Sequence, residues 1–138
     1  MKVSMTETAK GTFAVTLLPM PFEGDDVEPK LLGRLTINKQ ISGDLVATTR
    51  GQMLSAGTSI KGSAAYVAIE RVTGVLAGKN GSFVLQHTGT MNRGLPSLSV
   101  TVVPDSGTED LTGIEGEFKI SVVDGTHIYE FSYRLPGN

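Results

Sequence analysis

The chain contains no cysteine. This absence excludes a disulfide framework, a thiolate nucleophile and a zinc site built from cysteine ligands. Metal binding through nitrogen and sulfur ligands would then depend on the two histidines, His87 and His127, which lie far apart in the sequence. We therefore expect no metal site, and nothing in the sequence calls for an organic cofactor.

Long apolar runs and an excess of one charge are also missing. The first ten residues lack the apolar core of a secretory signal, and no apolar run approaches the roughly 20 residues that span a bilayer. The net charge is −2, and the basic residues are scattered singly, whereas nucleic-acid binders concentrate Lys and Arg on one face. We expect a cytoplasmic protein with no membrane or nucleic-acid partner.

What the sequence does contain is alternation of apolar and polar residues with a period of two, set among 17 glycines and six prolines. The last segment, 127–135, shows the pattern most clearly. Tyr129, Phe131 and Tyr133 fall on one face, while Glu130 and Ser132 fall on the other. A strand with one buried face requires this arrangement.

The same pattern predicts about eight strands, joined mostly by tight turns. The predicted turns contain Ser42-Gly43, Asn80-Gly81 and Asp124-Gly125, because these residues readily adopt positive φ angles. The predicted strands are 11–18, 31–41, 44–54, 65–77, 82–91, 98–103, 117–123 and 127–135.

This order predicts an all-β fold in one domain, residues 1–138, most simply a single antiparallel, mostly up-and-down barrel of about eight strands. A two-sheet sandwich is the main structural alternative. Residues 19–30 hold three of the six prolines and four acidic residues, so we expect a long connection over a barrel mouth or an oligomer contact. Thr108 is expected to cap one helical turn within 108–114.

Charged and polar residues interrupt the two central strands. Glu70 follows Tyr66 and a run of apolar residues, and His87 follows another apolar run. If the connecting loop has an even number of residues, cross-strand parity places Glu70, His87 and Tyr66 on one face, with Glu70 and His87 as diagonal neighbours. A carboxylate beside an imidazole orients the ring and suits acid and base chemistry at neutral pH.

Three interpretations of this pair remain open. An inward pair can be a satisfied structural network, a polar anchor for a ligand, or a catalytic pair in which His87 moves a proton and Glu70 orients it. The tyrosines Tyr66, Tyr129 and Tyr133 join the candidate ligand-binding residues, because a buried phenol needs a hydrogen-bond partner.

Several stretches together resemble a known family: residues 13–16, 42–45, 66–74, 81–90 and 103–116. The family consists of small uncharacterised bacterial proteins grouped as a domain of unknown function. It is similar in fold to the allene oxide cyclase barrel, an eight-stranded antiparallel barrel, and the glycine pattern from Gly107 to Gly116 resembles that of those barrels. The resemblance implies a cavity for a small, largely apolar molecule, and a homo-oligomer.

The leading functional hypothesis is therefore a barrel that binds a small, largely apolar ligand, with Glu70 and His87 as polar anchors. One alternative is a cofactor-free isomerase or cyclase that uses Glu70 and His87, which would require both side chains to face one cavity. Another is a structural or interaction module whose barrel is filled with side chains.

Overall fold

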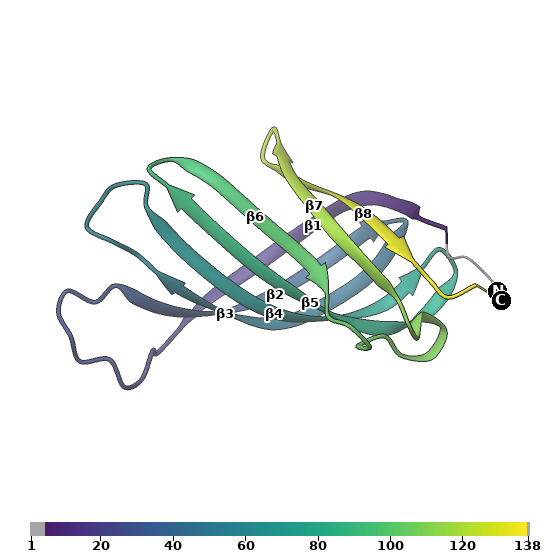
Figure 1. Cartoon of the computed structure of the whole chain (residues 1–138), viewed down its shortest axis with the longest axis horizontal. Coiled ribbons are helices and arrows are strands. Elements are labelled where there is room, and N and C mark those ends of the chain that lie inside the picture. The colour runs from purple at the N-terminus through teal and green to yellow at the C-terminus, as the bar shows by residue number, and fades with distance from the viewer. Residues whose placement is uncertain (1–4, 138) are drawn as a thin grey trace.

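The computed structural model describes residues 5–137, which form one closed antiparallel barrel with strands in sequence order (Figure 1). Strand β1 pairs with β8, so the sheet closes and the sandwich alternative is wrong. The strands are β1 Glu7–Met20, β2 Leu32–Gly43, β3 Leu45–Ala56, β4 Ala64–Leu76, β5 Lys79–Asn92, β6 Leu95–Val102, β7 Glu115–Val123 and β8 Thr126–Arg134.

Alternation along the strands produces the predicted inward and outward faces. On β5, Phe83, Leu85 and His87 are buried. Gln86 and Thr88, the residues on either side of His87, are exposed. This period of two confirms the all-β fold that the sequence predicts. Within residues 5–137, no helix is long and apolar enough to cross a membrane.

The turn between β4 and β5 differs from the prediction. Leu76 pairs with Lys79, so Ala77 and Gly78 form the turn, with φ angles of 47° and 82°. Asn80 lies inside β5 instead, opposite Val75. Gly81 is glycine for another reason, because a Cβ there would collide with the carbonyl oxygen of Thr108.

One end of the barrel is packed solid. The segment between β6 and β7 folds over this end and buries Leu111 and Ile114 in the core. Below them, the rings of Phe118 and Phe131 stack with centroids 4.1 Å apart. The segment between β6 and β7 is therefore part of the hydrophobic core.

The predicted helical turn in this segment is a 3₁₀ helix, η1 (Glu109–Leu111), preceded by Thr108. The predicted side-chain cap is wrong, since the Thr108 hydroxyl makes no cap hydrogen bond. Instead, Thr108 Oγ1 accepts a hydrogen bond from the backbone N–H of Ser82 at 3.0 Å. The side chain thus anchors η1 to β5 and does not satisfy the N–H groups of η1.

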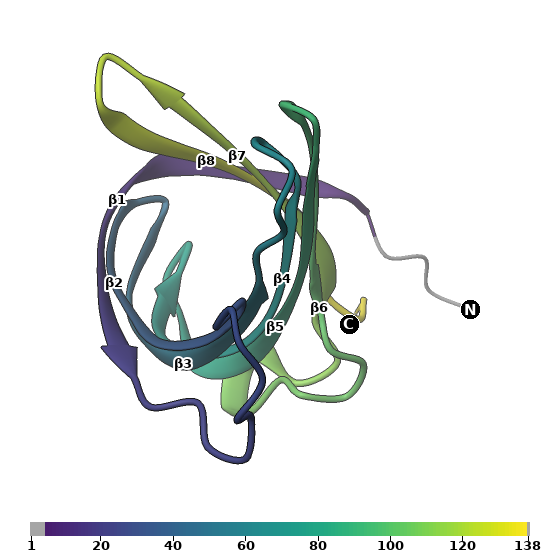
Figure 2. The ribbon, with the colours of Figure 1, turned by 90° about the vertical axis from the view of Figure 1, so that its left-hand side faces the viewer.

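The opposite end of the barrel is open. Leu98 on β6 and Met91 on β5 face the inside of the barrel, as the buried residues of these strands do. They nevertheless remain 46% and 40% exposed. The β1–β2 loop, residues 21–31, and the β3–β4 loop lie at this end, which faces the viewer in Figure 2. The barrel is therefore filled at one end and hollow at the other.

The closure between β6 and β7 is short. Only Val100 with Phe118 and Thr101 with Glu117 are paired there, whereas β4 and β5 pair along their whole lengths. Towards the open end, the β7–β8 hairpin stands away from β6 (Figure 2). From residue 95 to residue 99, the edge of β6 that faces β7 consequently lacks a neighbouring strand in the described part of the chain.

Candidate functional site

Glu70 is the centre of a buried polar network inside the barrel. Its side chain is fully buried, and its Oε1 accepts hydrogen bonds from Lys39 Nζ at 3.1 Å and His87 Nε2 at 2.8 Å. Its Oε2 accepts a hydrogen bond from Thr49 Oγ1 at 2.6 Å. The carboxylate thus has donors from β2, β3 and β5, three strands besides its own.

These donors decide the charge of Glu70. Burial alone raises the pKa of its carboxyl, but the hydrogen bond from His87, the positive charge of Lys39 and the hydrogen bond from Thr49 outweigh burial. The pKa of Glu70 therefore lies below its ordinary value of 4.5, and the group is ionised at neutral pH. An ionised carboxylate accepts only, so His87 Nε2 carries a hydrogen.

The geometry of the Glu70–His87 pair agrees with the parity argument. His87 pairs with Ala68 and Leu85 pairs with Glu70, which makes Glu70 and His87 diagonal neighbours on the inner face. The two-residue turn is the even-numbered connection that the argument required. Sequence reasoning found this pair because two polar residues interrupt apolar strands.

Lys39 and Thr49 were missed. Lys39 lies at an inward position between the buried Ile37 and Ile41, and Thr49 follows the buried Ala47 at the next inward position of β3, so the alternation itself was the available signal. Lys39 Nζ also lies 4.7 Å from the centre of the Phe13 ring, a cation–π contact. The two residues add a second charge and a further donor to the predicted pair.

The three tyrosines do not meet in one site. Tyr129 accepts a hydrogen bond from the backbone N–H of Leu45 at 3.1 Å and donates to the carbonyl of Ser42 at 2.9 Å, so it secures the β2–β3 turn. Tyr133 donates to Glu7 Oε2 at 2.9 Å, and burial together with that carboxylate raises the pKa of Tyr133 to about 12. Tyr66 alone lines the cavity at the open end.

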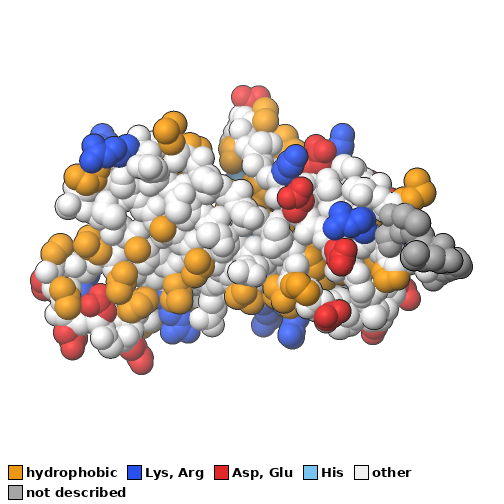
Figure 3. Space-filling view, in the orientation of Figure 1, with side chains coloured by type: hydrophobic (Ala, Val, Ile, Leu, Met, Phe, Trp, Pro, Cys, Tyr) orange, Lys and Arg blue, Asp and Glu red, His pale blue; other side chains and the backbone are white. Residues whose placement is uncertain are grey.

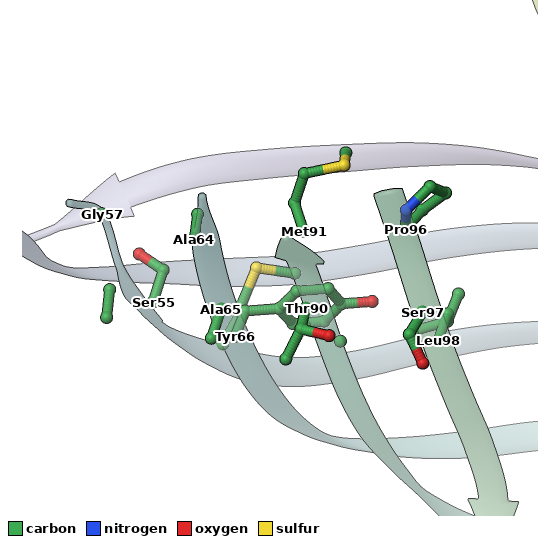
Figure 4. A pocket seen from close by; sticks show the side chains of 13 residues that line it. Ser55, Gly57, Ala64, Ala65, Tyr66, Thr90, Met91, Pro96, Ser97 and Leu98 are labelled. Carbon is green, nitrogen blue, oxygen red and sulfur yellow. The ribbon is translucent and has the colours of Figure 1, made fainter. Parts of the chain in front are cut away.

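That cavity has a volume of about 480 Å³ and lies between the inner faces of β3, β4, β5 and β6 near the rim (Figure 4). Most of its lining is apolar. The lining residues include Met53, Ser55, Ala64, Tyr66, Gly89, Met91 and Leu98. A volume of this size is typical of sites for small organic ligands.

Tyr66 lies between the cavity and the buried network. A Cβ at position 89 would collide with the Tyr66 ring, so Gly89 allows the ring to lie flat against β5. The ring centroid is 6.5 Å from that of His87. Tyr66 lines the cavity, while Glu70 and His87 lie behind it and are not among the lining residues.

His127, the second candidate metal ligand, does not contact Glu70: its ring packs against Phe13 with centroids 5.0 Å apart, and the other neighbour of the Phe13 ring is Lys39. Within residues 5–137, no three His, Asp or Glu side chains are grouped closely enough to hold a metal ion. The cavity lining itself contains the side-chain hydroxyl groups of Ser55, Tyr66, Thr90 and Ser97.

Comparison with known proteins gives the family. A family model described as "Protein of unknown function (DUF3224)" matches residues 9–133, a range that includes residues of all eight strands. The chain belongs to the DUF3224 family. This confirms the resemblance to a family of uncharacterised bacterial proteins. No curated protein matches the chain.

A solved structure of another DUF3224 protein, from Shewanella oneidensis MR-1 and described as a protein with unknown function, is similar to this chain. The two share 46% sequence identity and superpose with a TM-score of 0.90, over 96% of this chain and 100% of that one. The two DUF3224 proteins therefore share the barrel over nearly the whole of both chains.

Proposed function

We propose that this barrel binds a small, largely apolar molecule in the cavity at its open end. The observation that carries the proposal is the exposure of inward-facing apolar side chains, Leu98 and Met91, around a cavity of about 480 Å³. Apolar side chains that face the inside of a barrel and remain exposed gain stability when an apolar ligand covers them. The resemblance to allene oxide cyclase barrels supports the same kind of ligand.

The buried network favours binding over the two alternatives. A filled barrel would leave no cavity, whereas only the closed half is filled by core residues. An isomerase or cyclase would need Glu70 and His87 to face the cavity, whereas Glu70 is enclosed by Lys39, Thr49 and His87. The network holds four strands together beneath the site, and the ligand meets Tyr66 first.

A fluorescent probe tests the proposal. The native protein is titrated with Nile red, an uncharged dye whose emission shifts to shorter wavelength in apolar surroundings. Ala64→Phe places a ring in the cavity from the rim of β4 and is expected to weaken dye binding by about tenfold or more. Ala14→Phe is the matched control, because Ala14 is exposed with outward parity on β1.

Equal dye binding by the native protein and both variants would contradict the proposal, since the dye would then sit on an outer surface. Failure of the native protein to bind would also contradict it. Urea unfolding of the two variants shows whether either substitution changes the fold itself.

We also propose that the chain self-associates through an outer apolar face, defined by Leu54, Val67 and Ile69 on β3 and β4. All three side chains are exposed, and Leu54 and Val67 are cross-strand partners. A groove of about 270 Å³, lined in part by Phe22 and Leu32, continues this face. Apolar side chains gather over this part of the surface in Figure 3. Contiguous apolar surface of this kind is typical of protein contacts.

A further inference from the structure

The hydroxyl of Tyr66 differs from the other two tyrosine hydroxyls in having no protein partner. Tyr129 donates to the carbonyl of Ser42, and Tyr133 donates to Glu7. Among the described residues, no hydrogen-bond partner lies within reach of the Tyr66 hydroxyl, and the one fully enclosed side-chain oxygen or nitrogen without a partner is Thr36 Oγ1. The Tyr66 hydroxyl is therefore accessible, and the residue lines the cavity at the open end.

The ring of Tyr66 is held in a fixed direction by its neighbour on β5. Tyr66 and Gly89 lie directly opposite each other on β4 and β5. A Cβ at residue 89 would collide with the Tyr66 ring, so the ring fits against the strand only because residue 89 is glycine. Figure 4 shows the hydroxyl directed away from Gly57 and Ala64 at the rim. The hydroxyl thus lies on the inner side of the cavity.

The Tyr66 hydroxyl keeps its hydrogen at neutral pH. Burial, and to a smaller degree the negative charge of Glu70, raises the pKa of Tyr66 above its ordinary value of 10.0. A protonated phenol donates a hydrogen bond, and the matching group on a ligand is an atom with a lone pair, such as oxygen. The inner side of this apolar cavity therefore offers a hydrogen-bond donor.

The cavity has nothing to balance a charge on a ligand. None of the described residues that line it is charged. The buried cation Lys39 is already bonded to Glu70 at 3.1 Å. Moving a carboxylate into apolar surroundings without a cationic partner costs far more free energy than one hydrogen bond returns. The group that meets Tyr66 inside the cavity is therefore uncharged.

We propose that the ligand carries an uncharged oxygen at the end that enters the barrel first, and that this oxygen accepts a hydrogen bond from the Tyr66 hydroxyl. The inference rests on the proposed apolar cavity and adds the chemistry of the ligand's polar end. A ketone, an ester or an alcohol supplies such an oxygen. A hydrocarbon lacks it, and a carboxylate carries a charge.

Displacement of Nile red by two probes tests the hydrogen bond. 2-Octanone has the acceptor oxygen, and 1-octene has none. Tyr66→Phe removes only the phenol oxygen, so it is expected to weaken 2-octanone binding about fivefold, the ratio that one net hydrogen bond gives, and to leave 1-octene binding unchanged. A merely structural role of Tyr66 would change both affinities equally.

Tyr133→Phe is the matched control, because the Tyr133 hydroxyl bonds Glu7 and Tyr133 does not line the cavity. Both probes should bind this variant as they bind the native protein. Carbon-13 NMR of 2-octanone labelled at the carbonyl gives a second measurement, since a hydrogen bond moves the carbonyl resonance to higher chemical shift. We expect the bound resonance at higher shift in the native protein and in Tyr133→Phe than in Tyr66→Phe.

Two further probes define the oxygen. Octanoate, which is ionised at neutral pH, is expected to bind about tenfold or more weakly than 2-octanone. 1-Octanol distinguishes a hydroxyl source from a carbonyl source, because the ligand's own type of oxygen should lose more affinity in Tyr66→Phe.

The outcomes separate this inference from the proposed function. If 2-octanone binds Tyr66→Phe as tightly as the native protein, or if octanoate binds more tightly than 2-octanone, the assignment of the uncharged oxygen is overturned and the apolar cavity stands. Nile red binding without displacement by any of these probes would overturn it as well. If Nile red itself does not bind the native protein, the proposed function fails.

Discussion

At the scale of single residues, the charge on Glu70 is balanced inside the barrel and not by water. Its side chain is fully buried, and Lys39 is the positive partner, with its own side chain 7% exposed. Removing one member of such a buried pair leaves the other charge without compensation. Glu70→Gln is therefore expected to lower the free energy of unfolding by roughly 3 kcal/mol at neutral pH, as measured by urea denaturation.

The same substitution changes the pH dependence. The pKa of Glu70 is lower in the folded protein than its ordinary value of 4.5, so ionised Glu70 stabilises the fold above that pH. This contribution is lost as the pH falls from 4.5 through the folded pKa. Glu70→Gln should lack this part of the acid destabilisation.

Glu130→Gln is the matched control, because Glu130 is exposed on the outer side of β8. Its free energy of unfolding should differ from that of the native protein by less than about 0.5 kcal/mol. An equal effect of both substitutions would mean that the buried network does not stabilise the fold.

Half of this network was predictable from the sequence. Glu70 and His87 lie on neighbouring strands joined by a tight turn, so parity along one hairpin relates them. Lys39 Nζ reaches Glu70 from β2, across the intervening strand β3. That contact depends on the tilt and curvature of the barrel, which alternation along a single strand does not describe.

At the scale of elements, three hairpins use the same short turn. The pairs Ala77-Gly78, Arg93-Gly94 and Asp124-Gly125 all have positive φ at both positions, as the right-handed twist of the flanking strands favours. The sequence predicted the Asp124-Gly125 turn, which contains the favoured residue types. It did not predict the other two, because alanine and arginine are uncommon at a positive φ.

The β4–β5 turn can be tested by substitution, because the structure places it at Ala77-Gly78 and the sequence predicted it at Asn80-Gly81. Ala77 has φ of 47°, a conformation that disfavours alanine and that asparagine tolerates better. Ala77→Asn is therefore expected to raise the free energy of unfolding by up to about 1 kcal/mol in urea denaturation.

Asn80→Ala is the paired substitution. Asn80 lies in the exposed start of β5, so its loss should change stability by less than about 0.5 kcal/mol. If Asn80→Ala were the more disruptive of the two and Ala77→Asn destabilised the protein, the turn would lie at Asn80-Gly81.

At the scale of the whole molecule, alternation and strand count were enough to predict a barrel, because closing the sheet is the simplest way to cover both edges of a meander. They did not predict which end is hollow. Phe118 and Phe131 fill one end, while Gly89, Ala64 and Ser55 take little space at the other. That distribution follows from how eight strands are staggered around the barrel, a property of the closed structure.

The outer surface supports the last prediction, which concerns assembly. Ile69 is 55% exposed and lies beside Leu54 and Val67 on the outer apolar face. A stable dimer contact buries about 800 Å² on each partner, and apolar side chains at its centre supply most of the affinity. We therefore expect sedimentation velocity to give a mass that is a multiple of the chain mass.

Ile69→Lys should shift this mass towards that of a single chain, because a second copy would have to bury a lysine charge without a partner. Val123→Lys is the matched control, since Val123 is 51% exposed with outward parity on β7 of the β7–β8 hairpin, and it should leave the assembly intact. A native protein that sediments as a single chain at all concentrations would rule out the outer apolar face as a contact between copies.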